Sequence, residues 1–175
     1  MTKLLADIPR DTFWHGAILF AYHFGLRIGT VATLEESNFA DGELRVFTTK
    51  GRRLVREKLT PEVIDWLAVW KTIRPASDLP YLFPEQAAAY LAGAGLSREF
   101  RALMAKHGIT DRTFHGLRKT ATNREWKGAL AELGDKQAQA LAKLVMEKGY
   151  RRVQQLLAHA PGSDVTEKHY MQTAP

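Results

Sequence analysis

Between residues 43 and 59 the spacing of apolar residues changes from a helical period of about 3.6 to a period of two. This change constrains the fold more than any other feature of the sequence. Residues 43–49 and 53–59 alternate apolar and polar side chains, and Lys50-Gly51-Arg52 lies between them. Alternation with a period of two is typical of a half-buried strand, and two such runs joined by a short segment with glycine predict a β-hairpin. Elsewhere the apolar side chains mostly recur at helical spacing. The sequence therefore predicts an α+β domain, mainly α-helical, with one small antiparallel β-sheet.

Two helical segments are expected before the hairpin. The apolar residues that begin with Phe13 favour a helix over about residues 10–24, which Gly25 interrupts. A second helical stretch, residues 26–38, begins around Arg27. An arginine among apolar residues and glycines is rarely buried without an anionic partner, which could be an internal carboxylate or a bound anion.

A helix is expected directly after the hairpin. Thr60-Pro61 has a favoured N-cap residue followed by a favoured first-turn residue. The apolar side chains that follow fall at positions i, i+3, i+4 and i+7: Val63, Trp66, Leu67 and Trp70. This spacing predicts one buried face. Residues 74–84 are rich in proline and predict a loop.

Helices are expected through the rest of the chain. Residues 84–92 and 97–107 fit two helices, the second with Ser97 as its N-cap and Gly108 as its end. From Thr113 onward nearly all of the chain has helical character.

Charge and composition limit the class of partner. The net charge of +6 favours a polyanionic partner, although a solvated basic surface would give the same total. The absence of cysteine excludes disulfides, zinc–thiolate sites and cysteine nucleophiles. No apolar run is long enough to cross a bilayer, and the N-terminus lacks the pattern of a secretory signal. We expect a cytoplasmic protein that does not contact a membrane.

Several polar residues stand in settings that suggest chemistry. His115 and Arg118 lie three residues apart, so on a helix both could approach one anion. That spacing alone also occurs by chance in a chain with 6 histidines. His159 ends an amphipathic segment, where it could also cap the last carbonyls. The Asp164-Val165-Thr166-Glu167 spacing predicts a further helix start, with Tyr170 in the second turn.

Six of these residues follow one another in a characteristic order: Arg27, Lys50, His115, Arg118, His159 and Tyr170. The series resembles the catalytic signature of the tyrosine recombinases, the phage-integrase family. The local sequences Phe24-Gly25-Leu26-Arg27 and His115-Gly116-Leu117-Arg118 resemble its two arginine boxes. The resemblance covers about residues 13–171. Four features depart from it. Thr30 replaces a common acidic residue, and Lys119 replaces a common histidine. The segment of about residues 124–148 is an insertion expected to be helical, and the spacing from His159 to Tyr170 is slightly long.

The resemblance implies a fold and a mechanism. The fold is that of the catalytic domain of DNA breaking-rejoining enzymes, expected over residues 1–175 without the family's N-terminal core-binding domain. Tyr170 would attack a DNA phosphodiester and form a 3′-phosphotyrosyl intermediate. The remaining signature residues would stabilise the phosphate and transfer protons. Neither a cofactor nor a metal is implied.

The resemblance also implies partners. The substrate would be double-stranded DNA, contacted by Arg52, Arg53 and Lys119. The isolated chain is expected to be a monomer, with a homotetramer forming on DNA, in a bacterial, archaeal or phage-encoded setting near the nucleoid. Alternatives of related fold are a type IB topoisomerase and an inactive DNA-binding module, while charge alone would also allow an RNA-binding helical protein.

Overall fold

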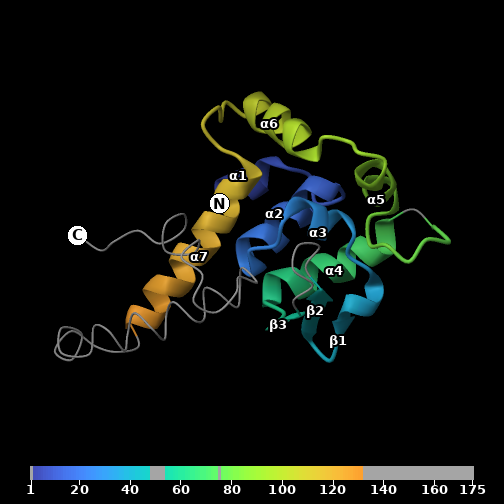
Figure 1. Cartoon of the computed structure of the whole chain (residues 1–175), viewed down its shortest axis with the longest axis horizontal. Helices are drawn as coiled ribbons and strands as arrows, with labels where there is room; N and C mark the ends of the chain where they lie inside the picture. The colour runs from blue at the N-terminus through green and yellow to red at the C-terminus, as the bar shows by residue number, and fades with distance from the viewer. Residues whose placement is uncertain (1, 48–53, 75, 132–175) are drawn as a thin grey trace.

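The computed structural model describes residues 2–47, 54–74 and 76–131. In chain order its elements are the helices α1 (Thr2–Asp7), α2 (Phe13–Phe24) and α3 (Ile28–Ala32), the 3₁₀-helix η1 (Glu36–Asn38), the strands β1 (Phe39–Ala40), β2 (Glu43–Phe47) and β3 (Leu54–Lys58), and the helices α4 (Pro61–Ile73), α5 (Pro84–Leu91), α6 (Leu96–Lys106) and α7 (Phe114–Ala131) (Figure 1). The predicted fold, mainly helical with one small antiparallel sheet, is confirmed.

The sheet has the strand order β1-β2-β3, and both pairs are antiparallel. Val46 lies opposite Val55 in the β2–β3 pair, and both side chains are buried. The predicted hairpin strands are therefore confirmed, with the alternation placing valines toward the core. β1 was not predicted; Asp41 and Gly42, with φ of 55° and 71°, form the two-residue turn that joins it to β2.

Helix α2 lies at the centre of the core. Its N-cap, Thr12, accepts a hydrogen bond from the backbone N–H of His15 at 3.3 Å, and the left-handed Gly25 ends it. Gly16 allows α4 to pack closely on α2, because a Cβ at this position would lie 2.4 Å from the ring of Trp66. Trp66 also stacks on Trp70 at 5.3 Å between ring centres. Aromatic packing thus holds α4 against α2.

For helix α4 the predicted buried face is confirmed, whereas the predicted capping hydrogen bond is not formed. Its buried residues are the four predicted: Val63, Trp66, Leu67 and Trp70. Thr60 occupies the N-cap position, but its side chain makes no capping hydrogen bond. The two indole N–H groups instead secure loops, since Trp66 donates to the carbonyl of Arg10 and Trp70 to that of Leu82, each at 3.0 Å.

The helices differ from the prediction in one additional helix and in two boundaries. Helix α1 was not expected. The stretch after Arg27 divides, because Thr33 ends α3 and donates its hydroxyl to the carbonyl of Gly29 at 2.9 Å. The predicted Ser97 cap is wrong: the helix begins one residue earlier, and the carbonyl of Gly95 accepts the first hydrogen bond, from Arg98 N–H at 2.7 Å. The predicted end is confirmed by Gly108, with φ of 71°.

Within the described ranges, no helix combines the length and apolar character needed to span a membrane.

Candidate functional site

Arg27 stands at the junction between α2 and α3. Gly25 turns the chain with φ of 60° and donates its N–H to the carbonyl of Ala21 at 3.0 Å, and Leu26 is buried directly after it. Arg27 is the N-cap residue of α3, and its carbonyl accepts from Val31 N–H at 2.9 Å. Its side chain is partly exposed and makes no hydrogen bond or ion pair with any residue that the structure describes. The internal carboxylate considered as its partner is therefore absent from this part of the chain.

The start of α3 is held by close packing. Thr30 is 1% exposed, and its hydroxyl has no hydrogen-bond partner in the described ranges, so it does not support Arg27 as a carboxylate could. Gly29 lies against α5 instead, since a Cβ there would be 2.2 Å from the hydroxyl oxygen of Tyr90. After α3, Leu82 N–H donates to the carbonyl of Leu34 at 2.6 Å. Helix α5 and the segment before it brace the element that carries Arg27.

His115 and Arg118 lie in the first turns of α7. The hydroxyl of Thr113 accepts from Gly116 N–H at 3.2 Å, as an N-cap does, and Phe114 anchors the turn in the core. Arg118 is only 2% exposed, whereas His115 is exposed. The two side chains thus lie one turn apart at different depths, the guanidinium inside and the imidazole outside.

Helix α7 packs along α2, so the element carrying Arg118 lies against the helix that leads into Arg27 (Figure 1). Lys119 is exposed on α7. The remaining predicted residues lie outside the described ranges: Lys50, Arg52, Arg53, His159 and Tyr170. Strand β2 ends just before the segment that contains Lys50, Arg52 and Arg53, and β3 begins just after it. The inserted segment is helical as predicted as far as Ala131.

The stem of the hairpin holds two further arginines, both in ion pairs. One carboxylate oxygen of Glu43 lies 2.7 Å from Arg56 Nε and 2.9 Å from Arg45 Nη2, and Arg45 also contacts Asp41 at 3.0 Å. Hydrogen bonds from Arg56 and then Arg45 lower the pKa of the Glu43 carboxyl. The carboxylates therefore partly neutralise both arginines of the stem.

A cluster at the end of α2 escaped sequence analysis. Arg124 of α7 donates a hydrogen bond to the carbonyl of His23 at 3.1 Å, and its guanidinium lies 4.6 Å from the ring centre of Tyr22. Burial lowers the pKa of His23, the charge of Arg124 lowers it further, and Glu62 opposes both effects. The cluster borders a cleft of about 550 Å³ whose wall includes the start of α4. No local motif could have revealed it, because the Arg124–His23 contact joins residues 101 apart.

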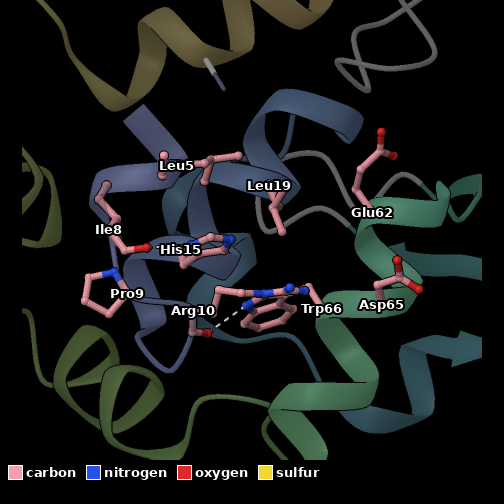
Figure 2. A pocket seen from close by; sticks show the side chains of 10 residues that line it. Leu5, Ile8, Pro9, Arg10, His15, Leu19, Glu62, Asp65 and Trp66 are labelled. Carbon is pink, nitrogen blue, oxygen red and sulfur yellow. Dashed lines mark hydrogen bonds between the residues drawn. The ribbon is translucent and has the colours of Figure 1, made fainter. Parts of the chain in front are cut away.

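A second cleft, of about 540 Å³, lies between α1, α2 and α4. Figure 2 shows His15 pointing at the carbonyl of Ile8, to which Nδ1 donates at 2.8 Å, and Trp66 reaching Arg10. Both rings are engaged with the backbone. This histidine therefore fastens the segment that follows α1 to α2.

The comparisons with known proteins define the class. The sequence model of the "Phage integrase family" matches residues 3–126, and the chain belongs to this family. The matched region contains Arg27, Lys50, His115 and Arg118 and ends before the last two signature residues.

One similar solved structure is described as the crystal structure of XerA recombinase. Its TM-score is 0.68 at 21% sequence identity, and the match covers 98% of this chain and 58% of that chain. The likeness supports the tyrosine-recombinase type of fold, and this chain spans somewhat more than half of the XerA chain. No curated protein sequence matches this chain.

Proposed function

We propose that this chain is the catalytic domain of a site-specific DNA recombinase in which Tyr170 is the nucleophile. The observation that carries the proposal is the family match over residues 3–126, which includes both arginine boxes. The structure adds support, because the elements bearing Arg27 and Arg118 pack against the same helix, α2.

The proposed reaction is a transesterification. The hydroxyl of Tyr170 loses its proton to His115 as its oxygen attacks the phosphorus of a DNA phosphodiester. A bond forms between the tyrosine oxygen and phosphorus, and the bond from phosphorus to the 5′-oxygen breaks. Lys50 gives a proton to that leaving oxygen. A 5′-hydroxyl from another strand reverses the step, and because the phosphodiester energy is retained in the tyrosyl ester, ATP is not consumed.

The two arginines stabilise the charge that develops on the phosphate. Planar guanidinium groups match the geometry of phosphate oxygens, and fixed cations act most strongly where water is excluded. Arg118 is buried, and the partly exposed Arg27 has no partner among the residues that the structure describes, so its guanidinium is available to an anion. In this proposal His159 donates a hydrogen bond to a non-bridging oxygen. Arg52, Arg53 and Lys119 contact the DNA backbone.

Capture of a covalent complex tests the proposal. The wild-type protein is incubated with a pool of nicked duplexes with randomised centres, so that the short fragment that carries the freed 5′-hydroxyl diffuses away and the protein–DNA ester accumulates. Complexes that survive denaturation are recovered and sequenced, which also reports the preferred target. We expect adducts with the wild type and with Tyr150→Phe, and none with Tyr170→Phe, which still binds DNA. Binding without any adduct would instead favour an inactive DNA-binding module.

The role of Lys50 has its own test. Replacing the 5′-oxygen at the cleaved bond by sulfur makes a leaving group that needs no proton, because a thiol is far more acidic than an alcohol. Lys50→Ala should cleave the normal duplex slowly and the sulfur-containing duplex at nearly the wild-type rate. Equal slowing on both duplexes would assign Lys50 to binding or charge stabilisation instead.

A further inference from the structure

Arg124 crosses from α7 to the end of α2. Its Nη2 donates to the carbonyl of His23 at 3.1 Å, while the guanidinium carbon lies 4.6 Å from the ring centre of Tyr22. His23 and Tyr22 belong to the last turn of α2, immediately before the turn that leads to Arg27. One side chain of α7 therefore touches α2 at the point where the chain departs for the first arginine box.

The chemistry of this contact requires a guanidinium. Carbonyls in the last turn of a helix lack intrahelical partners and carry the negative end of the helix dipole, so a cationic donor is favoured there. A planar guanidinium can donate in its plane and at the same time stack its face on an aromatic ring. A lysine ammonium is a point charge without this plane, so it is not expected to reproduce both contacts with the same geometry. The Arg124 side chain thus fixes the orientation of α7 as well as its distance from α2.

Two carboxylates lie near Arg124, and the hydrogen bond to the His23 carbonyl is shorter than the contact with Glu125. Glu125 lies 3.9 Å from Arg124 Nη2, longer than the bond to the His23 carbonyl. Glu62 of α4 acts on His23 through its charge. The Arg124 side chain remains 37% exposed, beside the cleft at the start of α4. A contact this exposed is expected to contribute only modestly to the overall stability.

The geometry links this contact to both arginine boxes. Arg124 follows Arg118 by six residues on one helix, about 9 Å along the axis, while Arg27 follows His23 by four residues. A shift of α7 by one residue would rotate Arg118 by about 100° relative to α2. The clamp formed by Arg124, Tyr22 and the His23 carbonyl therefore joins α7 to α2 close to both arginine boxes.

We propose that Arg124 is a positioning residue for phosphate cleavage, acting by holding α7 in register with the end of α2. This inference rests on the proposed function. It does not require Arg124 to touch DNA.

The test separates chemistry from binding and from stability. Arg124→Ala and Arg124→Lys are compared with the wild type in single-turnover formation of the covalent complex at saturating DNA, in DNA affinity, and in thermal unfolding. Arg101→Ala, which removes an exposed arginine from α6, is the matched control for charge. We expect both Arg124 variants to form the covalent complex about 10- to 100-fold more slowly, because displacement of a catalytic group by about 1 Å has effects of this size. The DNA affinity of Arg124→Ala should stay within about twofold of the Arg101→Ala value, since the same charge is lost, and that of Arg124→Lys within about twofold of the wild-type value, since the charge is kept.

The outcomes are distinct. A wild-type protein that forms no covalent complex overturns the proposed function and this inference with it. Active wild type with unchanged cleavage by Arg124→Ala overturns the inference alone, as does a loss of DNA affinity that accounts for the whole effect. If Arg124→Ala does not fold, Tyr22→Leu weakens the clamp while leaving the hydrogen bond to His23. A slower cleavage step with unchanged affinity supports the inference, and a wild-type rate contradicts it.

Discussion

Arg56 and Arg45 in the hairpin stem share the carboxylate of Glu43, whereas Arg27 at the start of α3 makes no side-chain hydrogen bond or ion pair in the described part of the chain. Both settings are partly solvent-exposed. They differ in what surrounds the arginine: charged neighbours on a strand surface in one case, and a turn between the buried Leu26 and the partly buried Ile28 in the other.

This difference separates structural arginines from those available for a ligand. An exposed arginine that already has a carboxylate contributes little to stability and must give up that partner to bind an anion. In the proposed mechanism Arg27 would bind a phosphate without breaking a contact to any residue that the structure describes. Sequence alone, which shows both kinds of arginine among other cations, does not make this distinction.

The largest expected effect is on the rate of covalent-complex formation, when an arginine is removed from each of these two settings in turn. Arg27→Ala should slow covalent-complex formation by about 100- to 1,000-fold, because it removes one fixed donor to the transition-state phosphate. Arg56→Ala should change the rate only slightly, since its guanidinium is held by Glu43. Single-turnover cleavage at saturating DNA measures both. Equal effects of the two substitutions would contradict the distinction.

A smaller effect is expected from the packing that supports Arg27. Gly29→Ala should lower the free energy of unfolding by about 1–3 kcal/mol, because the new methyl group meets the Tyr90 ring and hydroxyl. Gly116→Ala, where the nearest atom to the new Cβ is 3.8 Å away, should instead stabilise α7 by about 0.5–1 kcal/mol. Chemical denaturation measures both values. Restored stability and cleavage in Gly29→Ala/Tyr90→Ala would show that the clash is the cause.

The cleft beside Arg124 should make stability depend on pH. The pKa of His23 is lowered from 6.5 by burial and by Arg124, so the unfolded chain takes up this proton at a higher pH than the folded chain. As the pH falls below about 6.5, the unfolded state binds more protons and the free energy of unfolding decreases. His23→Gln should lose this component while other groups titrate as before. Identical pH profiles for wild type and variant would exclude a role for His23.

The smallest expected effect lies in the hairpin. Glu43→Gln releases Arg45 and Arg56 from their shared carboxylate and makes them resemble Arg27. Two released cations near the bound DNA should increase affinity slightly at low salt and steepen the dependence of log K on log salt concentration. A filter-binding titration over several salt concentrations measures the slope. An unchanged slope would place these arginines away from the DNA.

Several parts of the fold could be predicted because they depend on local periodicity. Alternation predicted the two strands of the hairpin, and helical spacing predicted the buried stripe of α4. Local chemistry was a weaker guide at helix starts. Ser97 was chosen as a cap by residue type, yet the backbone of Gly95 begins the helix, and Thr60 stands at an N-cap without making the bond. A residue type that favours the N-cap position indicates where a helix can begin, but tertiary packing decides where it does begin.

For the candidate site, the order of residues along the chain indicated the family, and the family model confirmed that membership over residues 3–126. The roles of the six signature residues remain predictions. What could not be predicted is the surroundings of each cation: the shared carboxylate of Glu43, or the clamp from Arg124 to the end of α2.

The sequence by itself determined which segments alternate, which helical faces are apolar and which polar residues recur in the order typical of a known family. Only the tertiary structure decided that Arg118 is buried, that Arg27 is not paired within the described ranges, and that α7 is tied to α2 by Arg124. The physical reason is distance along the chain. Periodicity depends on a few neighbouring residues. The partner of a charged side chain is instead the group that tertiary packing places within about 3 Å of it, which can be far away in the sequence.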